Sequence, residues 1–66
     1  MSDKLIRRPE VEARTGLART TIYARMARGE FPAPVKIGAR AVAWPESVID
    51  EWIEAQIEAG GQGVNQ

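Results

Sequence analysis

The stretch that decides the fold is RTGLARTTIYARMARGEF, residues 14–31. Gly16 predicts a tight turn in this stretch, because glycine readily adopts the left-handed backbone conformation that ends a helix. A second helix is expected to begin at Ala18 or Arg19 and to end at Gly29, since glycine commonly follows the last helical residue. A short helix, a turn and a basic second helix together form the pattern of a helix-turn-helix.

The helix before the turn is expected to run from about Pro9 to Arg14. Proline suits a first helical turn, where its missing N–H is not needed, and Glu10 and Glu12 are favourable near the positive end of the helix dipole. Val11 is expected to point into the core. This helix therefore supports the turn and the helix that follows.

The second helix has an inward stripe formed by Ile22 and Met26, which are four residues apart. The remaining side chains face outward or lie at the edges of the stripe. The outward face holds Thr20, Tyr23, Ala24, Ala27 and Arg28, and the edges hold Arg19, Thr21 and Arg25.

A rigid connector, FPAP at residues 31–34, leads into two short runs rich in β-forming residues, VKI at 35–37 and AVAW at 41–44. They predict a small hairpin whose tip is the segment GAR. Two strands alone are barely stable, so the hairpin must pack on the helices, through Phe31 and Trp44. Leu5 and Ile6 predict either a brief strand or a core anchor.

The last helix is expected to start around Pro45, or at Ser47, and to end at Gly60-Gly61. Trp52, like Trp44, is interpreted as a core residue and not as a platform for single-stranded bases, because the chain has few aromatic residues. The apolar arc of this helix is wider than one small core needs, which makes its outer part a candidate surface for weak self-association. The arc comprises Val48, Trp52, Ala55 and Ala59 beside Ile49, Ile53 and Ile57, and the self-association candidates are Ile53 and Ile57.

Length and composition restrict the function. Sixty-six residues form one domain, predicted at 1–59 with a disordered tail at 60–66. The chain has no cysteine and no histidine, and it has no phosphate-binding glycine-rich loop, so neither an enzyme nor a metal or cofactor site is expected. No apolar run approaches the roughly 20 residues of a membrane span, and the N-terminus lacks a signal-peptide pattern. A cytoplasmic protein without membrane contact is expected.

The net charge of zero conceals a strong asymmetry. Residues 1–40 contain all nine Lys and Arg residues and four acidic residues, a net charge of +5, whereas residues 41–66 contain five acidic residues and no basic one. Such a division predicts a basic binding surface in the first part of the chain. The acidic last helix is interpreted as a solvated face, a surface that repels DNA, or a weaker candidate for protein docking.

These residues in this order resemble the AlpA family of small phage and mobile-element regulators. The resemblance rests on TGLARTTIY, then GEFPAPVKIG, then WPESVIDEWI, and it covers roughly residues 5–57. It implies a mainly α-helical winged helix-turn-helix with three helices and a β-hairpin wing, related to excisionases and to MerR-type DNA-binding domains. It also implies binding to double-stranded DNA through the second helix and the wing, at Arg19, Thr20, Thr21 and Tyr23 and at Lys36 and Arg40.

Two residues depart from the family pattern. Ala18 stands where the family usually has serine, so a side-chain cap is lost at a cost of about 0.5–2 kcal/mol. Arg25 stands where an apolar residue is common, and it either contacts a phosphate or lays its stem over the core edge.

Each residue proposed to contact DNA also has an explanation that does not involve DNA. Arg19 and Thr20 open the second helix, whose first residues reach base edges in helix-turn-helix complexes. Arg19 contacts either a base or a phosphate, or it only serves the solubility of the helix. Tyr23 either donates to a phosphate or is an aromatic residue at the core edge. Arg28 contacts DNA or only stabilises the helix C-terminus. Lys36 and Arg40 reach the DNA backbone or minor groove, or they discourage edge-strand aggregation.

Three functions remain open from the sequence. The first is a sequence-specific transcriptional regulator of a prophage or mobile element, with RNA polymerase as a candidate partner. The second is an excisionase that bends attachment-site DNA for an integrase. The third is a protein-interaction module that uses the acidic helix.

Overall fold

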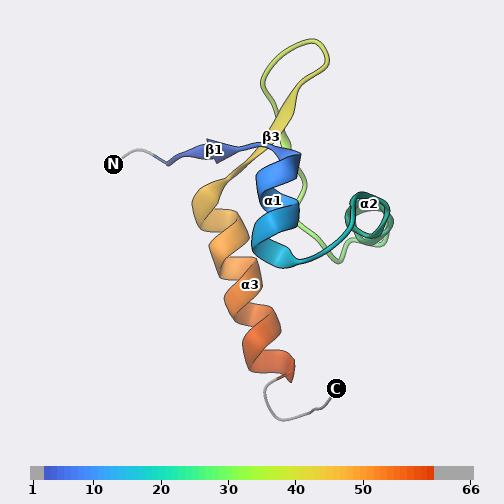
Figure 1. The fold of residues 1–66 in the computed structure, drawn as a ribbon, viewed down its shortest axis with the longest axis vertical. Coiled ribbons are helices and arrows are strands. Elements are labelled where there is room, and N and C mark those ends of the chain that lie inside the picture. The colour runs from blue at the N-terminus through green and yellow to red at the C-terminus, as the bar shows by residue number, and fades with distance from the viewer. Residues whose placement is uncertain (1–2, 61–66) are drawn as a thin grey trace.

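The computed structural model describes residues 3–60, which form three helices and a three-stranded antiparallel sheet (Figure 1). The order along the chain is β1 (Leu5–Ile6), α1 (Arg8–Thr15), α2 (Arg19–Ala27), β2 (Val35–Lys36), β3 (Val42–Pro45) and α3 (Glu46–Gly60). The predicted winged helix-turn-helix is confirmed. The tail predicted at 60–66 lies outside the described residues except for Gly60, the last residue of α3.

The turn between α1 and α2 follows the local signals of the sequence. Gly16 has φ +76°, and its N–H donates to the Glu12 carbonyl, which ends α1 in the left-handed conformation. The Thr15 hydroxyl donates to the Val11 carbonyl at 2.8 Å and accepts from the Leu17 N–H at 3.2 Å. These bonds satisfy backbone groups at the turn and direct the chain into α2.

The end of α2 uses a second glycine. Gly29 has φ +73°, its N–H donates to the Met26 carbonyl, and the Glu30 N–H donates to the Arg25 carbonyl. This pair of bonds is a Schellman motif, which satisfies the last free carbonyls of the helix. The last helical residue is Ala27, and the prediction that Gly29 ends this helix is confirmed.

The sheet has the order β1-β3-β2, so the predicted hairpin gains a third strand. Leu5 pairs with Pro45 and Ile6 with Trp44, which confirms the strand interpretation of this segment. Ile6 is also fully buried, so the core-anchor interpretation holds as well. The additional strand gives the central strand β3 partners on both sides, which a two-stranded hairpin lacks.

The core lies between the sheet and the three helices and contains the residues that periodicity predicts. Phe31 lies between two tryptophans, with ring centroids 6.2 Å from Trp44 and 4.8 Å from Trp52, both edge to face. The indole of Trp44 donates to the Pro32 carbonyl at 2.9 Å, and that of Trp52 donates to the Glu30 carbonyl at 3.2 Å. Both tryptophans therefore hold the connector that follows α2, and their interpretation as core residues is confirmed. The buried cluster is Ile6, Val11, Ile22, Phe31, Trp44 and Ile49, with Leu17, Met26, Val42, Trp52 and Ile53 packed against it.

The helix α3 extends well past the core (Figure 1). Ile49 is buried and Ile53 packs partly on the core, whereas Ala55 and Ala59 are exposed and Ile57 is 64% exposed. Only the first half of the predicted apolar arc is thus covered by this chain. No helix within residues 3–60 is both long and apolar enough to cross a membrane.

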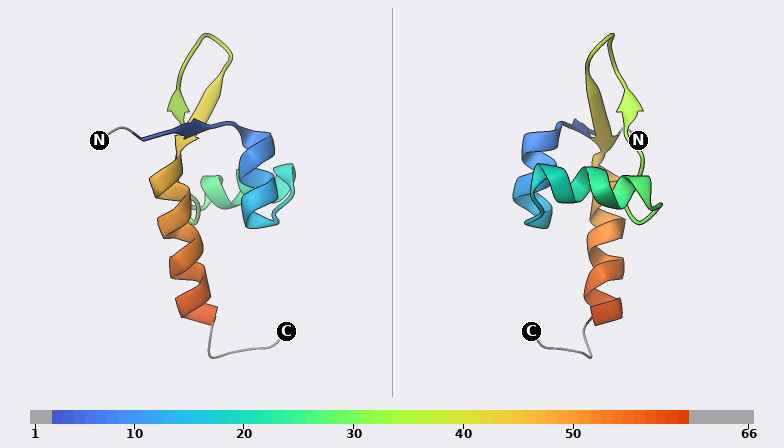
Figure 2. Two further views of the ribbon diagram at one scale, coloured as in Figure 1. Left: turned by 60° about the vertical axis from the view of Figure 1, so that its left-hand side comes forward. Right: turned by 90° about the vertical axis from the view of Figure 1, so that its right-hand side faces the viewer.

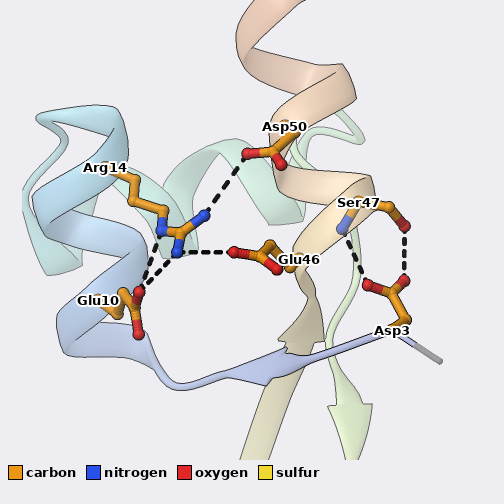
Figure 3. A network of polar contacts seen from close by, with 6 residues as sticks. All are labelled: Asp3, Glu10, Arg14, Glu46, Ser47 and Asp50. Carbon is orange, nitrogen blue, oxygen red and sulfur yellow. Dashed lines mark hydrogen bonds and ion pairs between the residues drawn. The ribbon is translucent and has the colours of Figure 1, made fainter.

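The first turn of α3 is fixed by the N-terminal segment (Figure 3). The Asp3 carboxylate accepts from the Ser47 hydroxyl at 2.6 Å and from the Ser47 N–H at 3.2 Å, and the Glu46 N–H donates to the Lys4 carbonyl at 2.7 Å. Asp3 thereby acts as an N-cap supplied from 44 residues away. These hydrogen bonds lower the pKa of Asp3, because they stabilise its charged form.

Candidate nucleic-acid interface

The outward face of α2 is the centre of the candidate interface. Ile22 is buried and Met26 half-buried, so the opposite face of the helix is open to solvent. Small side chains occupy the middle of this face, which lets another molecule approach the helix closely. Arg19, expected at the edge of this face, is exposed as well. The other exposed residues of α2 and its C-cap are those that the periodicity predicts, Thr20, Tyr23, Ala24, Ala27 and Arg28.

The N-terminal end of α2 has no side-chain cap. Ala18 is at the N-cap with an extended backbone, φ −77° and ψ 161°, and no side-chain hydrogen bond is made there. The first turn also contains no acidic residue, and it begins with Arg19 followed by Thr20. Free N–H groups and the positive end of the helix dipole make such a helix start favourable for an anion.

One flank of α2 carries Arg19 and Tyr23, four residues apart. The Arg19 guanidinium carbon lies 5.8 Å from the centre of the Tyr23 ring, within the range of a cation–π contact. On α1, the Nε of Arg8 donates to Glu12 at 2.9 Å. Glu12 first and the Tyr23 hydroxyl second raise the pKa of Arg8.

The other flank of α2 holds the half-buried Thr21 and Arg25, followed by Arg28 at the C-terminal end. Arg25 is half-buried at the edge of the exposed face and makes no ion pair among residues 3–60. Arg28 is at the C-cap and pairs with Glu30 at 3.1 Å. Arg28 is therefore far along the helix from Arg19, at the end where a cation is stabilised by the dipole.

The β2–β3 hairpin forms the wing, and it extends beyond α2 in Figure 2. The register pairs Lys36 with Val42 and Ile6 with Trp44. Because residues two apart on a strand share a face, Lys36 lies on the same side of the sheet as Trp44 and Ile6, the side that packs on the core. Arg40 is exposed in the loop at the tip. The opposite face of the sheet carries the exposed apolar side chains of Leu5, Val35 and Ile37.

Most of the basic side chains are free of internal ion pairs. Within residues 3–60, Arg8 pairs with Glu12 and Arg28 with Glu30 in local contacts, and Arg14 pairs with several acidic groups. The other six basic residues pair with no carboxylate in this part of the chain. They are Lys4, Arg7, Arg19, Arg25, Lys36 and Arg40.

Arg14 differs from the other arginines of the helix-turn-helix stretch. Its guanidinium contacts Glu10 at 2.7 Å on α1 and, on α3, Glu46 at 2.8 Å and Asp50 at 3.6 Å (Figure 3). Glu10 first and Glu46 second raise the pKa of Arg14. Arg14 therefore ties α1 to α3, and the acidic start of α3 is partly neutralised within the chain.

Two features of this surface were not evident from the sequence. The influence of the Tyr23 hydroxyl on the pKa of Arg8 is one, since only the Arg8–Glu12 spacing of four residues could have suggested that Arg8 is held in place. The contacts of Arg14 with Glu46 and Asp50 are the other, because they depend on how α1 lies beside α3. No group of three or more potential metal-binding side chains occurs within residues 3–60.

Three helices, a tight turn between the first two and a hairpin wing beside the exposed second helix define a winged helix-turn-helix protein. The first two helices each end at a glycine in the left-handed conformation. The chain belongs to the AlpA family, because its residues 4–57 match the family described as prophage CP4-57 regulatory protein (AlpA). The resemblance inferred from the sequence motifs is confirmed.

The chain is also similar in sequence to two individual proteins. The chain is 38% identical over 61 residues to the uncharacterized protein ORF88 of Enterobacteria phage P4, an alignment that covers 92% of this chain and 69% of the phage protein. It is 36% identical over 56 residues to the DNA-binding transcriptional activator AlpA of Escherichia coli K12, covering 76% of this chain and 80% of the relative.

Proposed function

We propose that this protein binds double-stranded DNA sequence-specifically and regulates transcription of a prophage or mobile element. The observation that carries the proposal is the exposed face of α2, which begins with Arg19 and Thr20 at an uncapped helix start. Membership of the AlpA family, with a relative described as a DNA-binding transcriptional activator, supports it.

The mechanism proposed for α2 is direct readout in the major groove. The first residues of a recognition helix reach base edges, and arginine can donate two hydrogen bonds to O6 and N7 of guanine. Thr20 has a hydroxyl for a base edge and a methyl for thymine, and the small Ala24 and Ala27 leave room for the groove wall. Each good bidentate contact discriminates by about 1–3 kcal/mol against the wrong base.

The flanks and the wing supply backbone contacts in this mechanism. Thr21, Tyr23, Arg25 and Arg28 lie along the flanks of α2, and Lys36 and Arg40 lie on the wing. Phosphate contacts fix orientation without reading sequence, and each neutralised phosphate adds to the salt dependence of binding. In this proposal Arg40 at the tip also reaches an adjacent minor groove.

The test is selection of bound duplexes from a random DNA pool, followed by affinity measurements on the recovered duplex over a range of salt concentrations. Arg19→Gln should lower the affinity and relax the preference at one base position. Arg40→Gln should weaken all duplexes alike and reduce the log–log salt slope by about one.

The matched control is Lys4→Gln, which removes the same charge from the residue before β1, away from α2 and the wing tip (Figure 1). It should change the affinity less than either variant. Duplex binding that is unchanged when Arg19 and Arg40 are both replaced contradicts the proposed interface and supports a protein-interaction module based on α3.

The genomic position of the recovered motif decides between two roles. A site overlapping a promoter supports a regulator and makes RNA polymerase the partner to test. Several adjacent sites at an attachment site, with bending of the DNA, support an excisionase that acts with an integrase. The description of the Escherichia coli relative as a transcriptional activator favours the first role.

Weak self-association through α3 is a separate proposal. Ile57 is 64% exposed on the part of α3 that extends beyond the core, whereas Ile53 packs partly on its own core. A second copy covering Ile57 and the exposed edge of Ile53 would bury this apolar surface. Sedimentation over a range of concentrations tests the proposal, and a constant monomer mass contradicts it.

A further inference from the structure

The ring of Tyr23 faces a charged side chain of its own helix. The guanidinium carbon of Arg19 lies 5.8 Å from the centre of the Tyr23 ring, one helical turn before it. On α1, Arg8 donates to Glu12 at 2.9 Å, and its pKa is raised by Glu12 first and by the Tyr23 hydroxyl second.

We propose that Tyr23 is a positioning residue, which holds the Arg19 guanidinium in the orientation required for base readout. The inference rests on the proposed DNA binding and assigns Tyr23 a role different from a phosphate contact of its own. Arg19 is exposed and has no carboxylate partner within residues 3–60, so the ring of Tyr23 is the group that restrains it.

The shape of the guanidinium allows Arg19 to contact Tyr23 and a base at the same time. A cation–π contact uses the flat face of the guanidinium, whereas its five N–H donors point outward in the plane of the group. Arg19 can therefore rest on Tyr23 and still present a pair of donors to O6 and N7 of guanine. Restraint before binding also reduces the side-chain entropy lost when the contact to a base forms.

The first test is made on the free protein. The δ-methylene protons of Arg19 should show an upfield ring-current shift in NMR spectra. The shift should be retained in Tyr23→Phe and lost in Tyr23→Leu, with circular dichroism confirming that both variants are folded. Absence of the shift in the unaltered protein overturns the inference.

The second test uses the duplex recovered by selection and its single-base variants. Tyr23→Leu should reduce the preference for the selected base at the Arg19 position by about five- to thirtyfold, the range of a cation–π contact that becomes desolvated. Tyr23→Phe should keep that preference to within about twofold, because the ring remains. In the Arg19→Ala background, Tyr23→Leu should cause no further loss, as expected for two residues that act together.

The opposite pattern would show another role. If Tyr23→Phe weakens binding to all duplexes equally, or if the effects of Tyr23→Leu and Arg19→Ala add, Tyr23 contacts the backbone itself and the inference is wrong. Failure of the unaltered protein to bind any duplex contradicts the proposed function, whereas a bound duplex with additive effects contradicts only the positioning role.

Discussion

Arg14 of α1 lies 2.8 Å from Glu46 of α3, measured between Nη2 and Oε2, and the same guanidinium contacts Glu10 and Asp50 (Figure 3). One arginine from the helix-turn-helix stretch therefore joins the first helix to the start of the last one. Its side chain is partly buried, and three carboxylates surround it. A single substitution there should loosen the contact between two elements without touching the apolar core.

Arg14→Gln is expected to lower the urea midpoint at low ionic strength, because the acidic groups of α1 and α3 lose their common cation. The difference from the unaltered protein should shrink as salt is added, since exposed charges are screened. Urea unfolding followed by tryptophan fluorescence measures it. Arg28→Gln is the control, because within residues 3–60 Arg28 pairs with a single acidic residue, Glu30, two positions away. A loss that does not depend on salt would point to packing instead of charge.

Asp3→Asn is expected to destabilise the protein at neutral pH, because the amide replaces the carboxylate that caps α3. The folded-state pKa of Asp3 lies below the usual 3.8, so its stabilising contribution is complete above that pH and is lost as the pH falls through the folded-state value. Thermal unfolding from neutral to acidic pH should show the gap between the two proteins closing below about pH 3.8. Ser47→Ala should reproduce the effect, whereas a gap that persists in acid contradicts the role of the charge.

Ile49→Val is expected to cost about 0.5–1.5 kcal/mol of unfolding free energy, because the removed methyl group leaves a small cavity beside buried neighbours. Ile49 is fully buried in the cluster between α3 and the sheet. Ile57→Val is the matched control on the same helix and should change stability by less than about 0.5 kcal/mol, since Ile57 is 64% exposed. If both substitutions lower the unfolding free energy equally in urea, Ile57 contributes to the core and the assigned boundary between the buried and exposed parts of α3 is wrong.

Ala18→Ser is expected to stabilise the protein by about 0.5–2 kcal/mol, because a serine hydroxyl can accept from a free N–H in the first turn of α2. Ala18 already has the extended backbone of an N-cap, so no rearrangement is needed. The measurement is again urea unfolding. Ala24→Ser in the middle of the same helix serves as the control and should not stabilise the protein, because serine is a poorer helix former than alanine. No gain from Ala18→Ser would mean that water already satisfies these donors.

The sequence by itself determined the features that depend on neighbouring residues. Gly16 and Gly29 marked two helix ends, the spacing of Ile22 and Met26 defined the inner face of α2, and the tryptophans were assigned to the core. These predictions succeeded because backbone conformation and helical periodicity are local properties. The ordered motifs also sufficed to identify the AlpA family.

Only the tertiary structure decided which separate elements meet. The pairing of β1 with β3, the capping of α3 by Asp3 from 44 residues away and the contacts of Arg14 with Glu46 and Asp50 all join distant parts of the chain. The same holds for the effect of the Tyr23 hydroxyl of α2, which after Glu12 raises the pKa of Arg8 of α1. The physical reason is that charge and periodicity specify which face of an element is polar, whereas the direction in which that face points depends on how the elements pack around one core.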